Sequence, residues 1–145
     1  MLFAGWDLSG INRFQTGPYA TVTGTTSIGS RRADYLGGSV NLSGDARSVS
    51  RYFNTAAFAP APDTRRGNSG VGIVAGPSLF GWDLSVRKEF KTNDRFKIRF
   101  QADLFKVLNH ANFSGLNTDS SSRDFGSLST AGPGRNIQIG LKLQF

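Results

Sequence analysis

The chain has no cysteine and only one histidine, and these two scarcities already exclude several kinds of chemistry. Without cysteine there are no disulfide bonds and no thiolate sites. With His110 alone, a metal site built from several histidines is impossible. The 145 residues also contain no run of ~18 apolar residues, which excludes a transmembrane helix. The absence of such a run does not exclude a membrane-spanning β-barrel, because barrel strands are short and only half apolar.

Positive charge is plentiful, with a net charge of +7, but it is not concentrated. Adjacent cations occur only as the pairs Arg31–Arg32, Arg65–Arg66 and Arg87–Lys88. The sequence has neither a basic helix nor a recognisable nucleic-acid-binding module. We therefore expect no nucleic-acid partner, and we interpret the charges as solvated groups of loops and strand ends.

The last ten residues, NIQIGLKLQF, show the strongest pattern in the chain. Apolar side chains occupy every second position, which gives a β-strand one apolar face and one polar face. The apolar positions are Ile137, Ile139, Leu141, Leu143 and Phe145. Three upstream segments repeat the alternation less regularly. The sequence thus predicts four strands, over residues 2–15, 79–90, 95–108 and 135–145.

The lengths of the strands and of their connections favour a membrane barrel over a soluble sheet. Each predicted strand is longer than the roughly five or six residues of a soluble strand. Residues 91–94 form a short turn, whereas the connections at about 17–78 and 109–134 are long. Outer-membrane barrels have short periplasmic turns and long extracellular loops. We expect an all-β fold, a partial transmembrane β-barrel of four antiparallel strands in meander order, with one long, poorly ordered extracellular loop.

Two groups of side chains are candidates for contacts with the surroundings. Aromatic residues cluster near the predicted strand ends, where membrane barrels carry interfacial girdles. They are Phe80, Trp82, Phe90, Phe96 and Phe145. In the long loop, Arg65 and Arg66 are predicted to contact an anionic surface partner, because guanidinium groups bind phosphate and carboxylate bidentately. Lys88 and Lys106 interrupt the apolar faces near strand ends, where long side chains reach the interface.

From Tyr52 onward the amino-acid sequence resembles one protein family. The similar segments are YFNTAAFAPAP (52–62), RGNSG (66–70), GPSLFGWDLSVRKEF (76–90), RFKIRFQADLFKVLNHANFSGLN (95–117), FGSL (125–128) and GRNIQIGLKLQF (134–145). Together they resemble the C-terminal end of TonB-dependent outer-membrane receptors of the Oar-like type, which often carry an N-terminal carboxypeptidase-regulatory-like domain. The earlier GWDLSGINRFQTG is similar to the strand that precedes the long loop.

The resemblance implies a 22-stranded barrel closed by a plug, of which residues 1–145 supply a C-terminal fragment with about the last four strands. The implied function is ligand uptake across the outer membrane of a Gram-negative-type bacterium. The implied partners are outer-membrane lipid, the remainder of the barrel and its plug, TonB through the missing N-terminal part, and the barrel assembly machinery through the C-terminal strand. No cofactor is implied.

Two other functional classes were weighed. A soluble β-sandwich binding module, for example for carbohydrate, needs a second sheet over the apolar faces, and only four strands are readable. An enzyme needs a catalytic constellation, and the spacing of His110 to the Ser and Asp residues gives none. We therefore predict that the protein is not an enzyme, and we keep the β-sandwich module as the alternative.

Overall fold

The computed structural model describes residues 5–91 and 96–145, and within them the chain is built from strands and two short 3₁₀ turns, η1 (Gly44–Ala46) and η2 (Thr55–Ala57). In this part of the chain no helix is long and apolar enough to cross a membrane. The chain divides into two compact units. The sheet unit comprises Met1–Gln15, Leu79–Ala111 and Pro133–Phe145, and the loop unit comprises Thr16–Ser78 and Asn112–Gly132.

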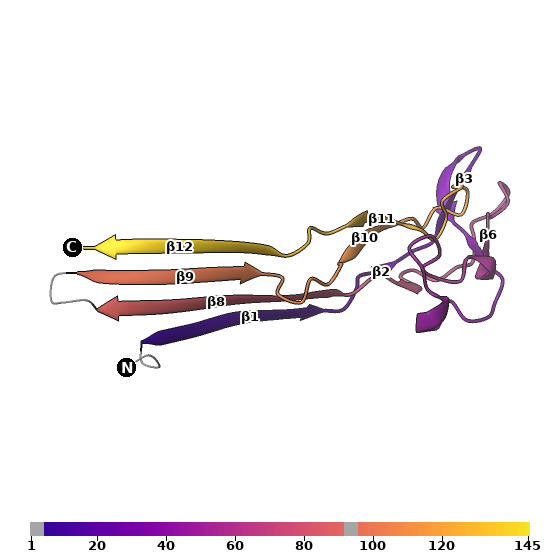
Figure 1. Ribbon diagram of the computed structural model, residues 1–145. Coiled ribbons are helices and arrows are strands. Elements are labelled where there is room, and N and C mark those ends of the chain that lie inside the picture. Colours follow the sequence, from indigo (N-terminus) through magenta and orange to yellow (C-terminus); the bar gives the residue numbers. More distant parts are fainter. Residues whose placement is uncertain (1–4, 92–95) are drawn as a thin grey trace. The chain divides into compact units, whose positions relative to one another are not determined.

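The sheet unit contains four long strands: β1 (Trp6–Gln15), β8 (Leu79–Lys91), β9 (Lys97–Phe105) and β12 (Asn136–Gln144). They lie side by side in the order β1-β8-β9-β12 (Figure 1), and every neighbouring pair is antiparallel. The prediction of four long antiparallel strands in meander order is therefore confirmed. The sheet is open, so β1 and β12 each have one edge without a partner strand among the described residues.

The register places the alternating patterns of all four strands in phase. Val86 stands opposite Leu8 on one side and Ala102 on the other, and Ala102 stands opposite Ile139. Because side chains alternate along each strand, this register collects the apolar residues on one face of the sheet and most of the polar residues on the other. We call these the apolar face and the polar face.

The third strand ends three residues earlier than predicted, at Phe105. Lys106 and Asn109 have positive φ values of 53° and 49°, which an extended strand does not allow. The backbone N–H of Lys106 donates to Asp83 Oδ1 at 2.8 Å, and its Nζ donates to the carbonyl of Pro133 at 2.8 Å. Lys106 therefore belongs to the turn and not to the apolar face.

Some sequence predictions fall on residues that the structure does not describe. These are the first three positions of the 2–15 strand, most of the 91–94 turn, and the start of the 95–108 strand. Over the described residues, β8 begins at the predicted Leu79 and extends one residue further, to Lys91.

The loop unit is folded, so the expectation of a poorly ordered long loop is wrong. Its strands are β2 (Tyr19–Ala20), β3 (Thr23–Thr26), β4 (Gly29–Arg32), β5 (Asp34–Tyr35), β6 (Phe58–Ala59), β7 (Val74–Ala75), β10 (Phe113–Leu116) and β11 (Leu128–Ala131). They form the pairs β2–β7, β3–β4, β5–β6 and β10–β11. A bridge between Thr23 and Asp119 joins the first long connection to the second.

The loop unit has a small aromatic core of its own, which explains why it folds. Phe53 is only 1% exposed, and its ring meets Phe58 at 5.9 Å and Phe125 at 5.3 Å, both edge to face. Val22 and Val74 are completely buried in the same cluster. Burying such side chains offsets the entropy of ordering a long connection, which the polar composition of the segment had concealed.

Candidate functional site

The apolar face of the sheet is uncovered. On β12, Ile139 is 71% exposed, Leu141 68% and Leu143 64%, and on β1 Leu8 is 68% exposed. A soluble sandwich would bury these side chains against a second sheet. The described core lies in the loop unit instead. An apolar face of this size, left open along four strands, marks a surface that meets lipid or another protein.

Aromatic side chains lie at the two ends of the apolar face. Phe80 and Phe90 stand ten residues apart on β8. At ~3.3 Å per residue this is ~33 Å along the strand, and a tilt of ~40° reduces it to ~25 Å along the membrane normal. The apolar band of outer-membrane barrels is about 25 Å tall. The spacing therefore fits two interfacial girdles, one at each end of β8.

The other predicted girdle residues are accessible at the surface, Phe145 almost completely. Trp82 is 40% exposed, Phe96 51% and Phe145 96%. Phe96 directly precedes β9, and Phe145 directly follows β12. Their contact with a membrane boundary remains a prediction that rests on these positions.

Through the β1–β8 register, two further aromatic residues lie at the levels of the predicted girdle residues, and the sequence analysis did not assign them there. Phe14 stands opposite Phe80, and their rings meet edge to face at 6.5 Å. Trp6 stands opposite Lys88 near the other end. The spacing within β1 gave no signal, because only the pairing with β8 puts these rings at the same level as the predicted girdle residues.

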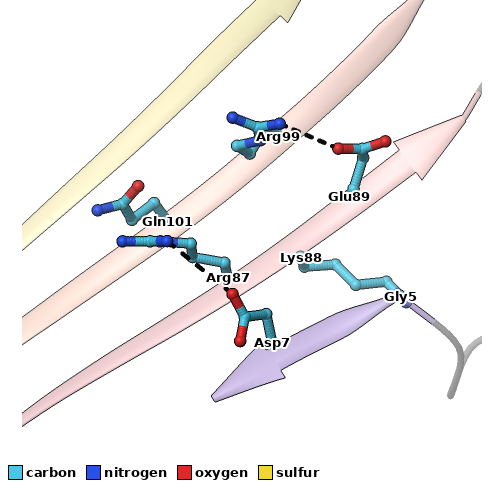
Figure 2. A pocket seen from close by; sticks show the side chains of 7 residues that line it. All are labelled: Gly5, Asp7, Arg87, Lys88, Glu89, Arg99 and Gln101. Atoms are coloured by element: carbon cyan, nitrogen blue, oxygen red, sulfur yellow. Dashed lines mark hydrogen bonds and ion pairs between the residues drawn. The ribbon is translucent and has the colours of Figure 1, made fainter. Parts of the chain in front are cut away.

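Lys88 is the one cation among the described apolar-face residues of the four strands, and aromatic rings enclose it. The residue is 4% exposed, and its Nζ lies 5.2 Å from the ring of Trp6 and 5.4 Å from that of Phe90. The side chain extends toward Gly5, at the end of the sheet (Figure 2). Cation–π contacts of this kind compensate for lost hydration. They let the lysine lie on the apolar face near the end of β8, and its reach to a membrane interface stays a prediction.

The polar face carries ionic and hydrogen-bonded pairs, some between neighbouring strands and one within β9. Arg87 Nη1 lies 3.9 Å from Asp7 Oδ2, and Arg99 Nη2 lies 3.2 Å from Glu89 Oε2 (Figure 2). Further along, Asp103 accepts hydrogen bonds of 2.6 Å from both Ser85 and Gln101. These pairs line one side of the sheet with charge, as the water-filled interior of a barrel requires.

A shallow cavity of about 260 Å³ lies at the end of the sheet where β8 and β9 are joined. Its lining comprises Gly5, Asp7, Arg87, Lys88, Glu89, Arg99 and Gln101, drawn from β1, β8, β9 and the residue before β1 (Figure 2). The cavity is thus lined mainly by polar-face charges. No group of three or more His, Cys, Asp or Glu side chains that could hold a metal ion occurs within residues 5–91 and 96–145.

In the loop unit, Arg65 forms a bidentate ion pair within the chain. Its Nη1 and Nη2 donate to Asp34 Oδ1 and Oδ2, each at 2.7 Å. The backbone N–H of Asn68 also donates to Asp34, and the Asn68 side chain accepts from the N–H of Tyr35. We call Asp34, Arg65 and Asn68 the clasp, because they tie β5 to a segment more than thirty residues later.

The clasp changes the proton affinity of its carboxyl group. The hydrogen bonds from Arg65 lower the pKa of Asp34 from its ordinary value, against the opposing effect of burial, and the Asn68 N–H lowers it further. Hydrogen bonds from Ser27 similarly lower the pKa of Asp63. Of the predicted anion-binding pair, Arg66 is exposed, whereas Arg65 has this structural partner. Binding of an anionic partner by the pair stays a prediction.

His110 lies just beyond the turn that ends β9. The residue is exposed, and its ring meets that of Phe80 edge to face, with centroids 6.0 Å apart. This contact puts His110 beside one of the aromatic girdles.

Comparison with known proteins gives one positive result. A family model described as an outer membrane beta barrel domain matches residues 1–138. No curated protein and no solved structure matches the chain. The match covers β1, β8, β9 and both parts of the loop unit, and it ends three residues into β12.

Proposed function

The chain belongs to the outer membrane beta barrel domain family, and we propose that its four-stranded sheet is part of the wall of a TonB-dependent receptor that takes up ligands. As an outer-membrane barrel protein it turns its apolar face to lipid and its polar face to the interior. Four strands are too few for closure, since the smallest barrels have about eight. The sheet therefore pairs with further strands along β1 and β12.

The observation that supports a barrel wall is the exposed apolar face, which has aromatic residues at both of its ends. Phe80 and Phe90 bound a band of ~25 Å, and Ile139 and Leu141 are exposed on the same face. The opposite face carries the ion pairs of Arg87 and Arg99. A carbohydrate-binding sandwich, the alternative, would cover the apolar side chains with protein.

The TonB-dependent part of the proposal rests on the resemblance of residues 52–145 to the Oar-like receptors. In the whole receptor the sheet contributes wall, and the folded loop unit contributes an extracellular lobe that faces arriving ligand. TonB and the plug supply the energy-coupled movement, and the terminal strand is the signal for the assembly machinery. The role is non-catalytic, and Arg66 is the member of the arginine pair more open to an anionic partner.

Tryptophan fluorescence tests the orientation of the sheet. The sequence has two tryptophans, Trp6 and Trp82, and both lie on the apolar face. In vesicles whose lipids carry bromine on the acyl chains, we expect strong quenching of both, and little quenching by a water-soluble quencher such as acrylamide. Strong acrylamide quenching with no effect of bromine would refute the proposed orientation.

A genetic comparison tests the receptor function without knowledge of the ligand. A strain lacking the gene and a strain lacking TonB are screened on the same panel of nutrients. Every nutrient whose uptake is lost with the gene should also be lost with TonB. If uptake of a nutrient requires this gene but not TonB, the TonB-dependent receptor function is contradicted. The proposal that the sheet is part of a barrel wall is not affected by that result.

A further inference from the structure

Charge is distributed unevenly along the polar face. Among the described strand residues, the half nearest the β8–β9 connection carries five cations, namely Arg87, Lys91, Lys97, Arg99 and Lys142. The same half carries two carboxylates, Asp7 and Glu89. The other half carries one cation, Arg13, and two carboxylates, Asp83 and Asp103. An anion that reaches the polar face is therefore attracted to the first half.

The two arginines of the basic half are incompletely neutralised by their neighbours. Within the described residues, the charged partner of Arg87 is Asp7 at 3.9 Å, which is beyond hydrogen-bond distance. Arg99 makes a single contact of 3.2 Å with Glu89. Each guanidinium group has five N–H donors. The Arg87 and Arg99 side chains are 46% and 42% exposed, so both are accessible to solvent.

The nearest further carboxylate is already engaged. Both oxygens of Asp103 accept short hydrogen bonds, one from Ser85 and one from Gln101. These two contacts use about half of the lone-pair sites of the carboxylate, and within the described residues Asp103 forms no ion pair with Arg87. Arg87 and Arg99 both line the 260 Å³ cavity (Figure 2).

The strand register fixes the backbone spacing of Arg87 and Arg99. Arg87 stands opposite Gln101, and Arg99 is two residues further along β9. Such diagonal neighbours lie about 7–8 Å apart at the backbone. Two carboxylate or phosphate groups joined by a short linker span this distance, and each can accept a fork of two N–H groups.

We propose that Arg87 and Arg99 form a binding site for small solutes that carry two carboxylate or phosphate groups. The inference rests on the proposed function, because the polar face must border the aqueous interior for solutes to reach it. Lys142 and Lys97 add attraction without direct contact. The site then selects doubly charged anions from the solutes that enter the barrel.

Titration of the full chain in detergent micelles tests the site, with the arginine Nε–H signals in NMR spectra as the readout. The probes are succinate, acetate and the uncharged diamide of succinate. We expect succinate to shift the Arg87 and Arg99 signals and to bind at least tenfold more tightly than acetate, with no response to the diamide. Equal responses to succinate and acetate would overturn the proposal.

Variants separate specific binding from net charge. The double substitution R87Q/R99Q should weaken succinate binding at least tenfold, and R87K/R99K, which keeps the charge but loses the fork, should give an intermediate affinity. The matched control R13Q removes one positive charge from the other half of the polar face and should leave the affinity unchanged. An equal loss in R13Q would overturn the proposal.

Two further measurements identify the source of any failure. A hexaglutamate peptide that binds far more tightly than succinate would identify an acidic polypeptide as the occupant and overturn the solute site. Bromine quenching of Trp6 and Trp82 is measured on the same variants in vesicles. Retained quenching without succinate binding refutes only this inference, whereas lost quenching refutes the barrel orientation.

Discussion

Replacing Ile139 by arginine tests which face of the sheet meets lipid. Ile139 is 71% exposed on the apolar face, and the next residue, Gly140, lies on the polar face of the same strand. A Cβ at Gly140 would meet no atom within 4 Å, so an arginine there has room. The pair I139R and G140R therefore places the same charge one residue apart on opposite sides of the sheet.

The position of Ile139 sets the size of the effect. It is six residues from Phe145, which is ~20 Å along the strand and ~15 Å along the membrane normal at a tilt of ~40°. In a band of about 25 Å this lies close to the middle. An arginine on the lipid face costs about 2–4 kcal/mol there. At Gly140 the side chain stays hydrated, and we expect a change within ~1 kcal/mol.

Equilibrium unfolding by guanidinium chloride in phospholipid vesicles measures both variants against the parent. We expect I139R to lose about 2–4 kcal/mol of unfolding free energy and G140R to stay close to the parent value. The reasoning fails if the two variants lose equal stability, or if G140R loses more. In water, an arginine at an exposed position is nearly neutral, so an unaffected I139R would show that water covers the apolar face.

Two predictions concern the loop unit. Replacing Phe53 by alanine removes a ring that is 1% exposed and should cost about 3–5 kcal/mol, seen as faster protease cleavage within residues 16–78 while the sheet stays protected. The lowered pKa of Asp34 means that the clasp stabilises the loop unit above the ordinary carboxyl pKa of ~3.9, and that this contribution is lost as the pH falls through the lowered pKa of the folded state. Asp34→Asn should therefore lower the protease resistance of the loop unit at pH 7. The variant should also lose less protease resistance than the parent when the pH is lowered, and an identical pH dependence of protease resistance in both would contradict the role of the clasp.

The strands of the sheet could be predicted closely because each one carries its own signal. Alternation at period two marks β8 and β12 within one or two residues of their observed ends. The end of β9 was missed, because the positive φ values at Lys106 and Asn109 have no marker such as glycine. The turn at Lys106 is held by a hydrogen bond from its backbone N–H to Asp83, which lies more than twenty residues away in sequence.

The loop unit and much of the candidate site could not be predicted, because they depend on contacts between distant residues. The clasp joins Asp34 to Arg65, and nothing in the local sequence distinguishes Arg65 from Arg66. The core around Phe53 needs Phe125 from the second long connection. A segment rich in Gly, Ser and Pro resembles an unstructured loop until these few apolar residues are brought together.

The sequence by itself determined that the protein has four long strands with one apolar side each, because side-chain direction in a strand follows from position alone. Only the tertiary structure decided which residues stand opposite one another. The register between strands decides which aromatic residues lie at the same height along the sheet. It also brings Trp6 and Phe90 next to Lys88, and it sets which carboxylates lie near Arg87 and Arg99. Pairing is a property of two segments at once, and no single segment specifies it.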